Sequence, residues 1–109
     1  MNDIKSKTNR NSDRKRAKFI EQLGEASIKY KQIDEGIIIL KENHGDVDLA
    51  SLTTLPENVT FKNQGDVDLD SLTTLPENVT FKNQGDVYLD LLTTLPENVT
   101  FENQGDVYL

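Results

Sequence analysis

A unit of twenty residues is repeated along most of the second half of this chain. Residues 61–80 read FKNQGDVDLDSLTTLPENVT, and residues 81–100 repeat them with two substitutions. Residues 41–60 differ at four positions, and residues 101–109 begin a further copy. A fixed period of this length is typical of solenoids, in which every copy forms one coil that stacks on the preceding coil. The period therefore predicts a repeat architecture.

The direction of the side chains within the unit follows from strand alternation. In residues 66–70, DVDLD, alternation turns Val67 and Leu69 inward and the three aspartates outward. Phe81 is also expected to face inward, and Asn83, two residues later, shares its direction. A buried amide requires hydrogen-bond partners, which we expect in the equivalent asparagines of adjacent coils or in the backbone at the bend.

Glycine and proline mark the expected corners of each coil. Glycine recurs at one position of the repeat, where we expect a positive φ, at Gly65, Gly85 and Gly105. Pro76 suits another corner because its φ is fixed and it has no N–H to donate. Gly36 is expected to close the preceding helix in a left-handed conformation.

The chain before the repeats is expected to form a cap. Residues 1–12 are polar and are predicted to be a disordered basic tail. Residues 13–35 are predicted to form a helix that covers the open end of the first coil, because apolar residues recur at steps of three and four, namely Phe19, Leu23, Ala26, Tyr30 and Ile33. The β-branched run at residues 37–40 predicts the first strand, with Ile39 in the position of Val59.

The unit resembles the leucine-rich-repeat class of solenoids in its short bacterial form. The matching residues are Leu72, Leu75 and Pro76 of L-x-x-L-P, the V-x-F pair that follows, and the next asparagine. Here the asparagine is spaced F-x-N instead of L-x-L-x-x-N, and the added GDVDL strand is more similar to a β-helix coil. The expected fold is therefore mainly β, a solenoid over residues 36–109 with an N-terminal α-helical cap.

Charge is divided unevenly along the chain. The net charge of −7 combines +3 from residues 1–43 with −10 from residues 44–109. The first part contains a basic cluster made of Arg14, Lys15, Arg16 and Lys18. Two interpretations of this cluster stay open, a solvated face of the capping helix or a contact for nucleic acid or an acidic partner.

Stacking of the coils predicts columns of aspartates along one flank. With about 4.8 Å between coils, three columns form: Asp46, Asp66, Asp86 and Asp106; Asp48 and Asp68; Asp70 and Asp90. A DNA duplex carries one negative charge per ~3.4 Å along each strand, so this flank imitates a phosphate backbone. The functional interpretation is a DNA mimic that binds a basic, nucleic-acid-binding protein, and the alternative is a solvated face that resists aggregation.

No catalytic set, metal or cofactor is expected. The chain has no cysteine, which excludes disulfides and thiolate metal sites, and its only histidine, His44, lies at a predicted turn. A calcium-loop pattern is matched at four positions by Asp66, Asp68, Asp70 and Glu77. Ser71 stands where that loop requires glycine, so we do not expect calcium binding. The sequence predicts a protein that is not an enzyme.

The outward residues change from acidic to apolar toward the C-terminal coils. The column that begins with Asp48 and Asp68 continues with tyrosine, and a leucine replaces the serine of the earlier copies. Exposed aromatic and aliphatic side chains at a strand edge predict a homodimer through Tyr88, Leu91, Tyr108 and Leu109. The alternative is that the chain is a fragment of a longer array.

Near-identical repeats in a small chain without a catalytic set look like inhibitors encoded by phages or mobile elements, including anti-CRISPR proteins. This resemblance implies a non-enzymatic protein that acts in the cytoplasm of a bacterial host by binding a basic protein. Two other functions stay open, an assembly scaffold acting through the C-terminal edge and a nucleic-acid binder acting through the basic helix. No apolar run approaches the ~20 residues that span a bilayer, so we expect a cytoplasmic protein.

Overall fold

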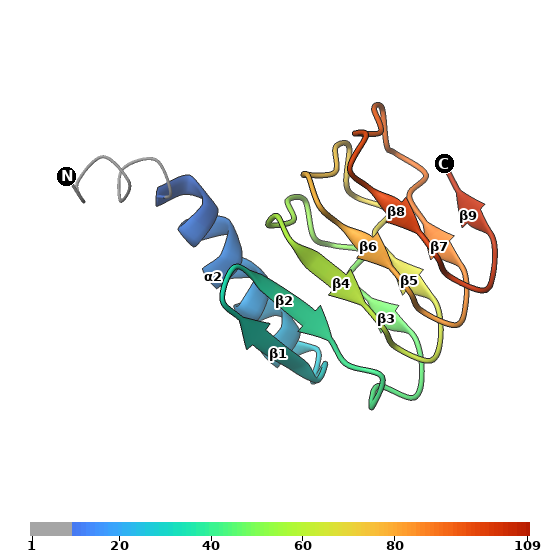
Figure 1. Cartoon of the computed structure of the whole chain (residues 1–109), viewed down its shortest axis with the longest axis horizontal. Coiled ribbons are helices and arrows are strands. Elements are labelled where there is room, and N and C mark those ends of the chain that lie inside the picture. Colours follow the sequence, from blue (N-terminus) through green and yellow to red (C-terminus); the bar gives the residue numbers. More distant parts are fainter. Residues whose placement is uncertain (1–9) are drawn as a thin grey trace.

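The structure is a computed structural model, and it describes residues 10–109 (Figure 1). One helix, α2 (Arg10–Glu25), is followed by a β-solenoid of about four turns. Residues 10–12, which we expected in the tail, form the beginning of α2, and the disorder expected for residues 1–9 lies outside the described part of the chain. Within residues 10–109, no helix combines the length and the apolar character that a membrane span requires.

The helix ends ten residues before the predicted boundary at residue 35. Ser27 adopts a φ of 57°, its N–H donates to the Gly24 carbonyl, and the N–H of Ile28 donates to the Leu23 carbonyl. These two bonds and the left-handed residue form a Schellman motif, which closes a helix. The prediction was wrong because it assigned this closing role to Gly36, which lies in a strand and has no positive φ.

A β-hairpin replaces the second half of the expected helix. Strand β1 (Tyr30–Ile33) pairs antiparallel with β2 (Gly36–Ile39), with Tyr30 opposite Ile39. Of the apolar residues assigned to the helix face, Phe19 and Leu23 are fully buried in the core, whereas Ala26 and Ile33 are exposed. The helix therefore covers the first coil as predicted, but only through its last two turns.

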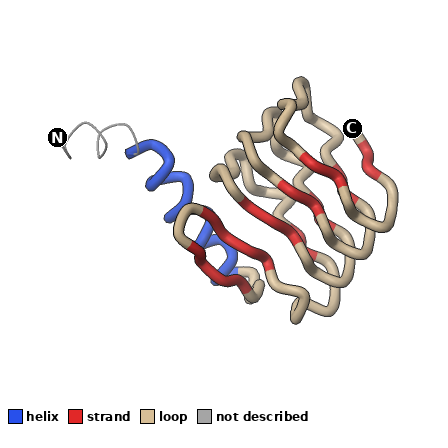
Figure 2. The backbone as a smooth tube through the Cα atoms, viewed as in Figure 1, coloured by secondary structure: helices blue, strands red, loops and turns tan. Residues whose placement is uncertain are grey.

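Each coil contributes a strand to each of two sheets, both parallel beyond the hairpin. The strand order is β1-β2-β4-β6-β8 in the first sheet and β3-β5-β7-β9 in the second (Figure 1). The bounds are β3 (Val47–Asp48), β4 (Val59–Phe61), β5 (Val67–Asp68), β6 (Thr80–Phe81), β7 (Val87–Tyr88), β8 (Thr100–Phe101) and β9 (Val107–Tyr108). Figure 2 shows how short these strands are beside the irregular connections that complete every coil.

The coils stack in register, and this packing forms one continuous core. Val67 pairs with Val87 and Thr60 with Thr80, so the twenty-residue period is also the structural period. The ring of Phe81 stacks on Phe61 and Phe101, with centroids 5.1 and 5.2 Å apart. Phe61 and Phe81 are fully buried by the coils on both sides, whereas Phe101, on the edge strand β8, is half-buried, so no coil has an independent core.

The first coil departs from the period. Ile37 pairs with Val59 and Ile39 with Phe61, so the expected match of Ile39 to Val59 is wrong. The connection from Ile39 to Val47 is two residues longer than the equivalent connection from Phe61 to Val67. This longer connection brings the apolar run of β2 into register with the apolar positions of β4.

The recurring glycines are needed because the coils approach closely. No glycine in residues 10–109 has a positive φ, and the residues of the repeat that do are Asn58 and Asn78. A Cβ on Gly65 would lie 2.6 Å from the carbonyl carbon of Gly45 and 2.8 Å from the nitrogen of Asp46. The expected backbone conformation was therefore wrong for Gly65, Gly85 and Gly105.

The buried asparagine of each coil holds the backbone of two coils together. Nδ2 of Asn63 donates to the carbonyls of Gly45, Gly65 and Asp66, at 3.2, 3.3 and 3.0 Å. Asn83 makes the equivalent three bonds one coil later, and both side chains are fully buried. Of the two kinds of partner that we expected, the structure therefore shows the backbone at the bend.

Candidate protein-binding face

The predicted aspartate columns lie on the outer side of the second sheet. We define the acidic face as the eight carboxylates of Asp46, Asp48, Asp66, Asp68, Asp70, Asp86, Asp90 and Asp106. They occupy β3, β5, β7 and β9 or the residues that flank these strands. Because the coils stack in register, equivalent carboxylates follow one another at about 4.8 Å along the solenoid.

The first aspartate column has a structural role that the sequence analysis missed. Oδ1 of Asp46 accepts the backbone N–H of Asp66, Oδ1 of Asp66 accepts that of Asp86, and Oδ1 of Asp86 accepts that of Asp106, each at 2.8 Å. These bonds connect successive coils at the corner. A signal for them was present in the sequence, because this position is aspartate in all four copies while neighbouring outward positions vary.

The other two columns make weaker structural contributions. Oδ1 of Asp48 accepts the N–H of Ala50 at 3.1 Å, and Oδ1 of Asp68 accepts that of Asp70 at 3.2 Å. These bonds form short turns within one coil. In the third column, Oδ1 of Asp70 accepts the N–H of Asp90 in the next coil at 3.3 Å. The repeat itself has tyrosine at position 88 of the second column and alanine at position 50 of the third, so the coil tolerates other side chains there.

Asp68 is the carboxylate on this face with an altered pKa. Burial raises its pKa, the charges of Asp70 and Asp48 raise it further, and the N–H of Asp70 opposes the shift. A raised pKa means that the ionised form is less favourable in the folded protein than in the unfolded chain. Like charges at this point of the acidic face therefore repel one another without relief from a base.

We expect Asp68→Asn to be more stable than the wild-type protein at neutral pH. The ionised carboxylate destabilises the folded state above its raised pKa, and this effect disappears as the pH falls below the ordinary value of 3.8. Thermal unfolding is measured from about pH 7 to pH 3. The Tm of the variant should exceed that of the wild-type protein at about pH 7, and the two Tm values should converge in acid. Glu77→Gln removes an exposed charge outside the acidic face, and an equal gain in that control would contradict the assignment to Asp68.

No base neutralises the acidic face in the described part of the chain. The salt bridge found among the side chains that the structure describes, those of residues 14–109, joins Lys82 to Glu102 at 3.9 Å, beside the first sheet. Lys62 occupies the position equivalent to Lys82, so it also lies outside the acidic face. The carboxylates are consequently available to basic groups of another molecule, with Asp46, Asp48, Asp90 and Asp106 exposed and Asp66, Asp68, Asp70 and Asp86 half-buried.

The structure divides the predicted basic cluster into two parts. Nη2 of Arg16 donates to the carbonyls of Ile33 at 3.0 Å and Gly36 at 2.9 Å, which ties α2 to the hairpin. Arg16 is therefore a structural residue as well as a charge. The other three side chains are exposed on α2, and we call them the basic ridge: Arg14, Lys15 and Lys18.

The aromatic and aliphatic residues assigned to a dimer are mostly exposed. The rings of Tyr88 and Tyr108 stack with their centroids 5.0 Å apart. Burial and the nearby carboxylates raise the pKa of Tyr88, and the carboxylates of Asp86 and Asp106 raise that of Tyr108. Leu91 and Leu109 are 56% and 63% exposed. The homodimer through these four residues stays a prediction.

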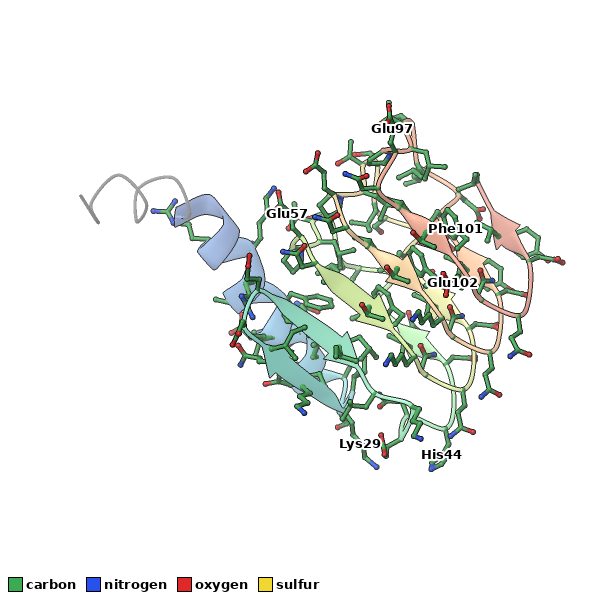
Figure 3. The ribbon with its side chains drawn as sticks, in the orientation of Figure 1. Lys29, His44, Glu57, Glu97, Phe101 and Glu102 are labelled. Atoms are coloured by element: carbon green, nitrogen blue, oxygen red, sulfur yellow. The ribbon has the colours of Figure 1, made fainter. Side chains whose placement is uncertain are left out.

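Neither the histidine nor the calcium-like pattern forms a metal site. His44 lies on the connection between β2 and β3 and points away from the body (Figure 3), and its Nδ1 is 2.9 Å from Nε2 of Gln64. Across the region that the structure describes, no group of three or more His, Cys, Asp or Glu side chains is arranged to hold a metal ion.

The fold and this surface define a capped β-solenoid with one strongly acidic face. Comparisons with protein-family models, with curated proteins and with solved structures find no match to this chain. The leucine-rich-repeat resemblance therefore receives no support from them, and neither does the resemblance to phage-encoded inhibitors.

Proposed function

We propose that this protein is a non-enzymatic binding protein whose acidic face occupies a basic surface of a nucleic-acid-binding protein and so blocks nucleic acid. The observation that supports this function is the set of eight aligned carboxylates without a basic partner in the described residues. An inhibitor of the anti-CRISPR kind, acting inside a bacterial host, is the type of protein that this function fits.

The carboxylates of the first column can bind a partner while they hold the coils together. In Asp46 and Asp66 the backbone N–H binds Oδ1, so Oδ2 of each can accept from lysine or arginine. In Asp86 both oxygens are used, because Oδ2 accepts from the hydroxyl of Tyr88 at 3.4 Å. Repeated negative charge on one face attracts a basic surface over a distance of about one Debye length, ~10 Å at 0.1 M salt. Binding should therefore be fast at low salt and weaken steeply as salt rises.

A nucleic-acid binder is the second candidate, and the exposed basic ridge favours it. The two functions predict opposite results with DNA alone. A DNA-binding protein retains a labelled duplex, whereas a DNA mimic is repelled by the duplex and competes with it.

The proposed function is tested by displacement of DNA. DNA-binding proteins of a bacterial lysate are collected on duplex DNA, and those that immobilised chain captures are identified and purified. Each purified protein is then loaded with a labelled duplex in the absence of the chain. Added wild-type chain should release the duplex from a captured protein. The triple variant Asp68→Asn, Asp70→Asn, Asp90→Asn removes three charges, and at about 0.5 kcal/mol per exposed pair we expect release to weaken about tenfold.

The matched control lies on the other side of the solenoid. Lys62→Gln with Lys82→Gln changes two exposed charges beside the first sheet and should leave release unchanged or slightly stronger. The DNA-mimic function would be contradicted if a captured protein kept its duplex, or if the aspartate variant released the duplex as well as the wild-type chain does. Retention of the duplex by the free chain would support the second candidate instead.

A further inference from the structure

The chain carries two exposed surfaces of opposite charge that do not meet within one molecule. The N-terminal half of α2 projects away from the solenoid and bears the basic ridge (Figures 1 and 2). The acidic face lies over the second sheet, β3-β5-β7-β9. Opposite charges on separate surfaces of one molecule provide complementary halves of a contact between molecules.

The spacing of the charges on the two surfaces is similar. An α-helix rises about 1.5 Å per residue, so Lys15 and Lys18 are separated by ~4.5 Å along the helix axis and Arg14 and Lys18 by ~6 Å. Carboxylates of one column follow at about 4.8 Å. A helix lying along a column therefore places Lys18 and either Arg14 or Lys15 beside successive carboxylates.

The helix cannot reach the acidic face of its own chain. Phe19 and Leu23 are fully buried in the core at the end of the solenoid, and Arg16 binds two carbonyls around the hairpin turn. Moving α2 across the second sheet would remove these contacts. The acidic face that binds the basic ridge therefore belongs to another molecule.

We propose that two copies of this chain associate by placing the basic ridge of one copy, Arg14, Lys15 and Lys18, on the acidic face of the other. The occupant is a second copy because the same chain supplies both signs of charge at a matching spacing. Self-association then covers the face that a basic partner would use, so a partner competes with the second copy. The proposal does not depend on the proposed function, since it concerns the purified chain alone.

The test is a charge swap followed by analytical ultracentrifugation. One variant carries Arg14→Glu, Lys15→Glu and Lys18→Glu, and the other carries Asp48→Lys, Asp68→Lys, Asp70→Lys and Asp90→Lys. The aspartates chosen lie in columns where the repeat already accepts tyrosine or alanine, so the fold should survive. Thermal unfolding of each variant verifies that it is folded before its mass is measured.

We expect wild-type chain to exceed its monomer mass of 12.3 kDa at low salt and concentrations up to about 1 mM, and to return to it near 1 M salt. Each variant alone should stay monomeric, because both surfaces of the first are acidic, and because the four lysines on the face of the second offset the charges of Asp46, Asp66, Asp86 and Asp106. An equimolar mixture of the two should associate again, since the second variant keeps the basic ridge and the first keeps the unchanged acidic face.

Three results would overturn the proposal. The first is a wild-type chain that stays monomeric at low salt. The second is a mixture of folded variants that does not associate. The third is association that persists near 1 M salt and in the variant with the acidic helix, which would assign the contact to the apolar residues Tyr88, Leu91, Tyr108 and Leu109 instead.

Discussion

Gly85→Ala is expected to lower the free energy of unfolding by about 3 kcal/mol or more. A Cβ on Gly85 would lie 2.7 Å from the carbonyl carbon of Gly65 and 2.8 Å from the nitrogen of Asp66. Both neighbours are backbone atoms of the preceding coil, so they cannot rotate away as a side chain does. The coils would have to separate, which weakens the hydrogen bond from the N–H of Gly85 to the Gly65 carbonyl at 3.1 Å. Urea unfolding followed by circular dichroism measures the loss.

Gly45→Ala is the matched control for this prediction. It occupies the same position of the repeat in the first copy, but a Cβ there meets no atom within 4 Å because no equivalent coil precedes it. We expect it to change the free energy of unfolding by less than about 0.5 kcal/mol. If both variants lose the same free energy of unfolding, the glycines are needed for their backbone conformation and not for the close approach of the coils.

Asn83→Asp is expected to lower the free energy of unfolding by about 4 kcal/mol at neutral pH. The change has almost no effect on volume, but it replaces the donor group that binds the carbonyls of Gly65, Gly85 and Asp86 with a buried carboxylate oxygen. An ionised carboxylate facing three carbonyl oxygens is both desolvated and repelled. The solenoid must therefore bind a proton at this site or unfold.

The pH dependence separates the buried charge from the lost hydrogen bonds. Burial raises the pKa of the introduced carboxyl above its ordinary value of about 3.9. The loss of stability is then complete above the raised pKa and diminishes as the pH falls toward the ordinary value. Part of the loss should remain in acid, because a protonated carboxyl has one donor where the amide has two.

Gln84→Glu adds the same charge at the next residue, which is exposed. We expect its stability to differ from wild type by less than about 0.5 kcal/mol. A similar loss in Asn83→Asp and Gln84→Glu would mean that net charge decides stability here. The structure instead assigns the effect to the buried corner.

The sequence was sufficient to predict the coil and its inward side chains. Val67, Leu69 and Phe81 are fully buried, as strand alternation required, and so is Asn83. Alternation is a property of each strand by itself, so it can be read without knowing the partner strands. The positions of the aspartate columns follow from the same period once the coils stack in register.

The end of the helix could not be predicted in the same way. Tyr30 and Ile33 continue the helical spacing of Phe19 and Leu23, but they lie in strand β1. Two different elements in succession produced one apparent period. The hairpin prevails because β1 pairs with β2 along its whole length, and this pairing depends on residues outside the segment that was read as helix.

By itself, the sequence determined the period, the inward and outward positions and the division of charge. Only the tertiary structure explains why Asn63, Gly65 and Asp66 recur together in each copy. Asn63 bonds the backbone of two coils, Gly65 leaves room for the preceding coil, and the Asp66 carboxylate accepts an N–H from the next. The physical reason is that all three roles depend on distances between residues eighteen to twenty positions apart, and these distances exist only after the coils have stacked.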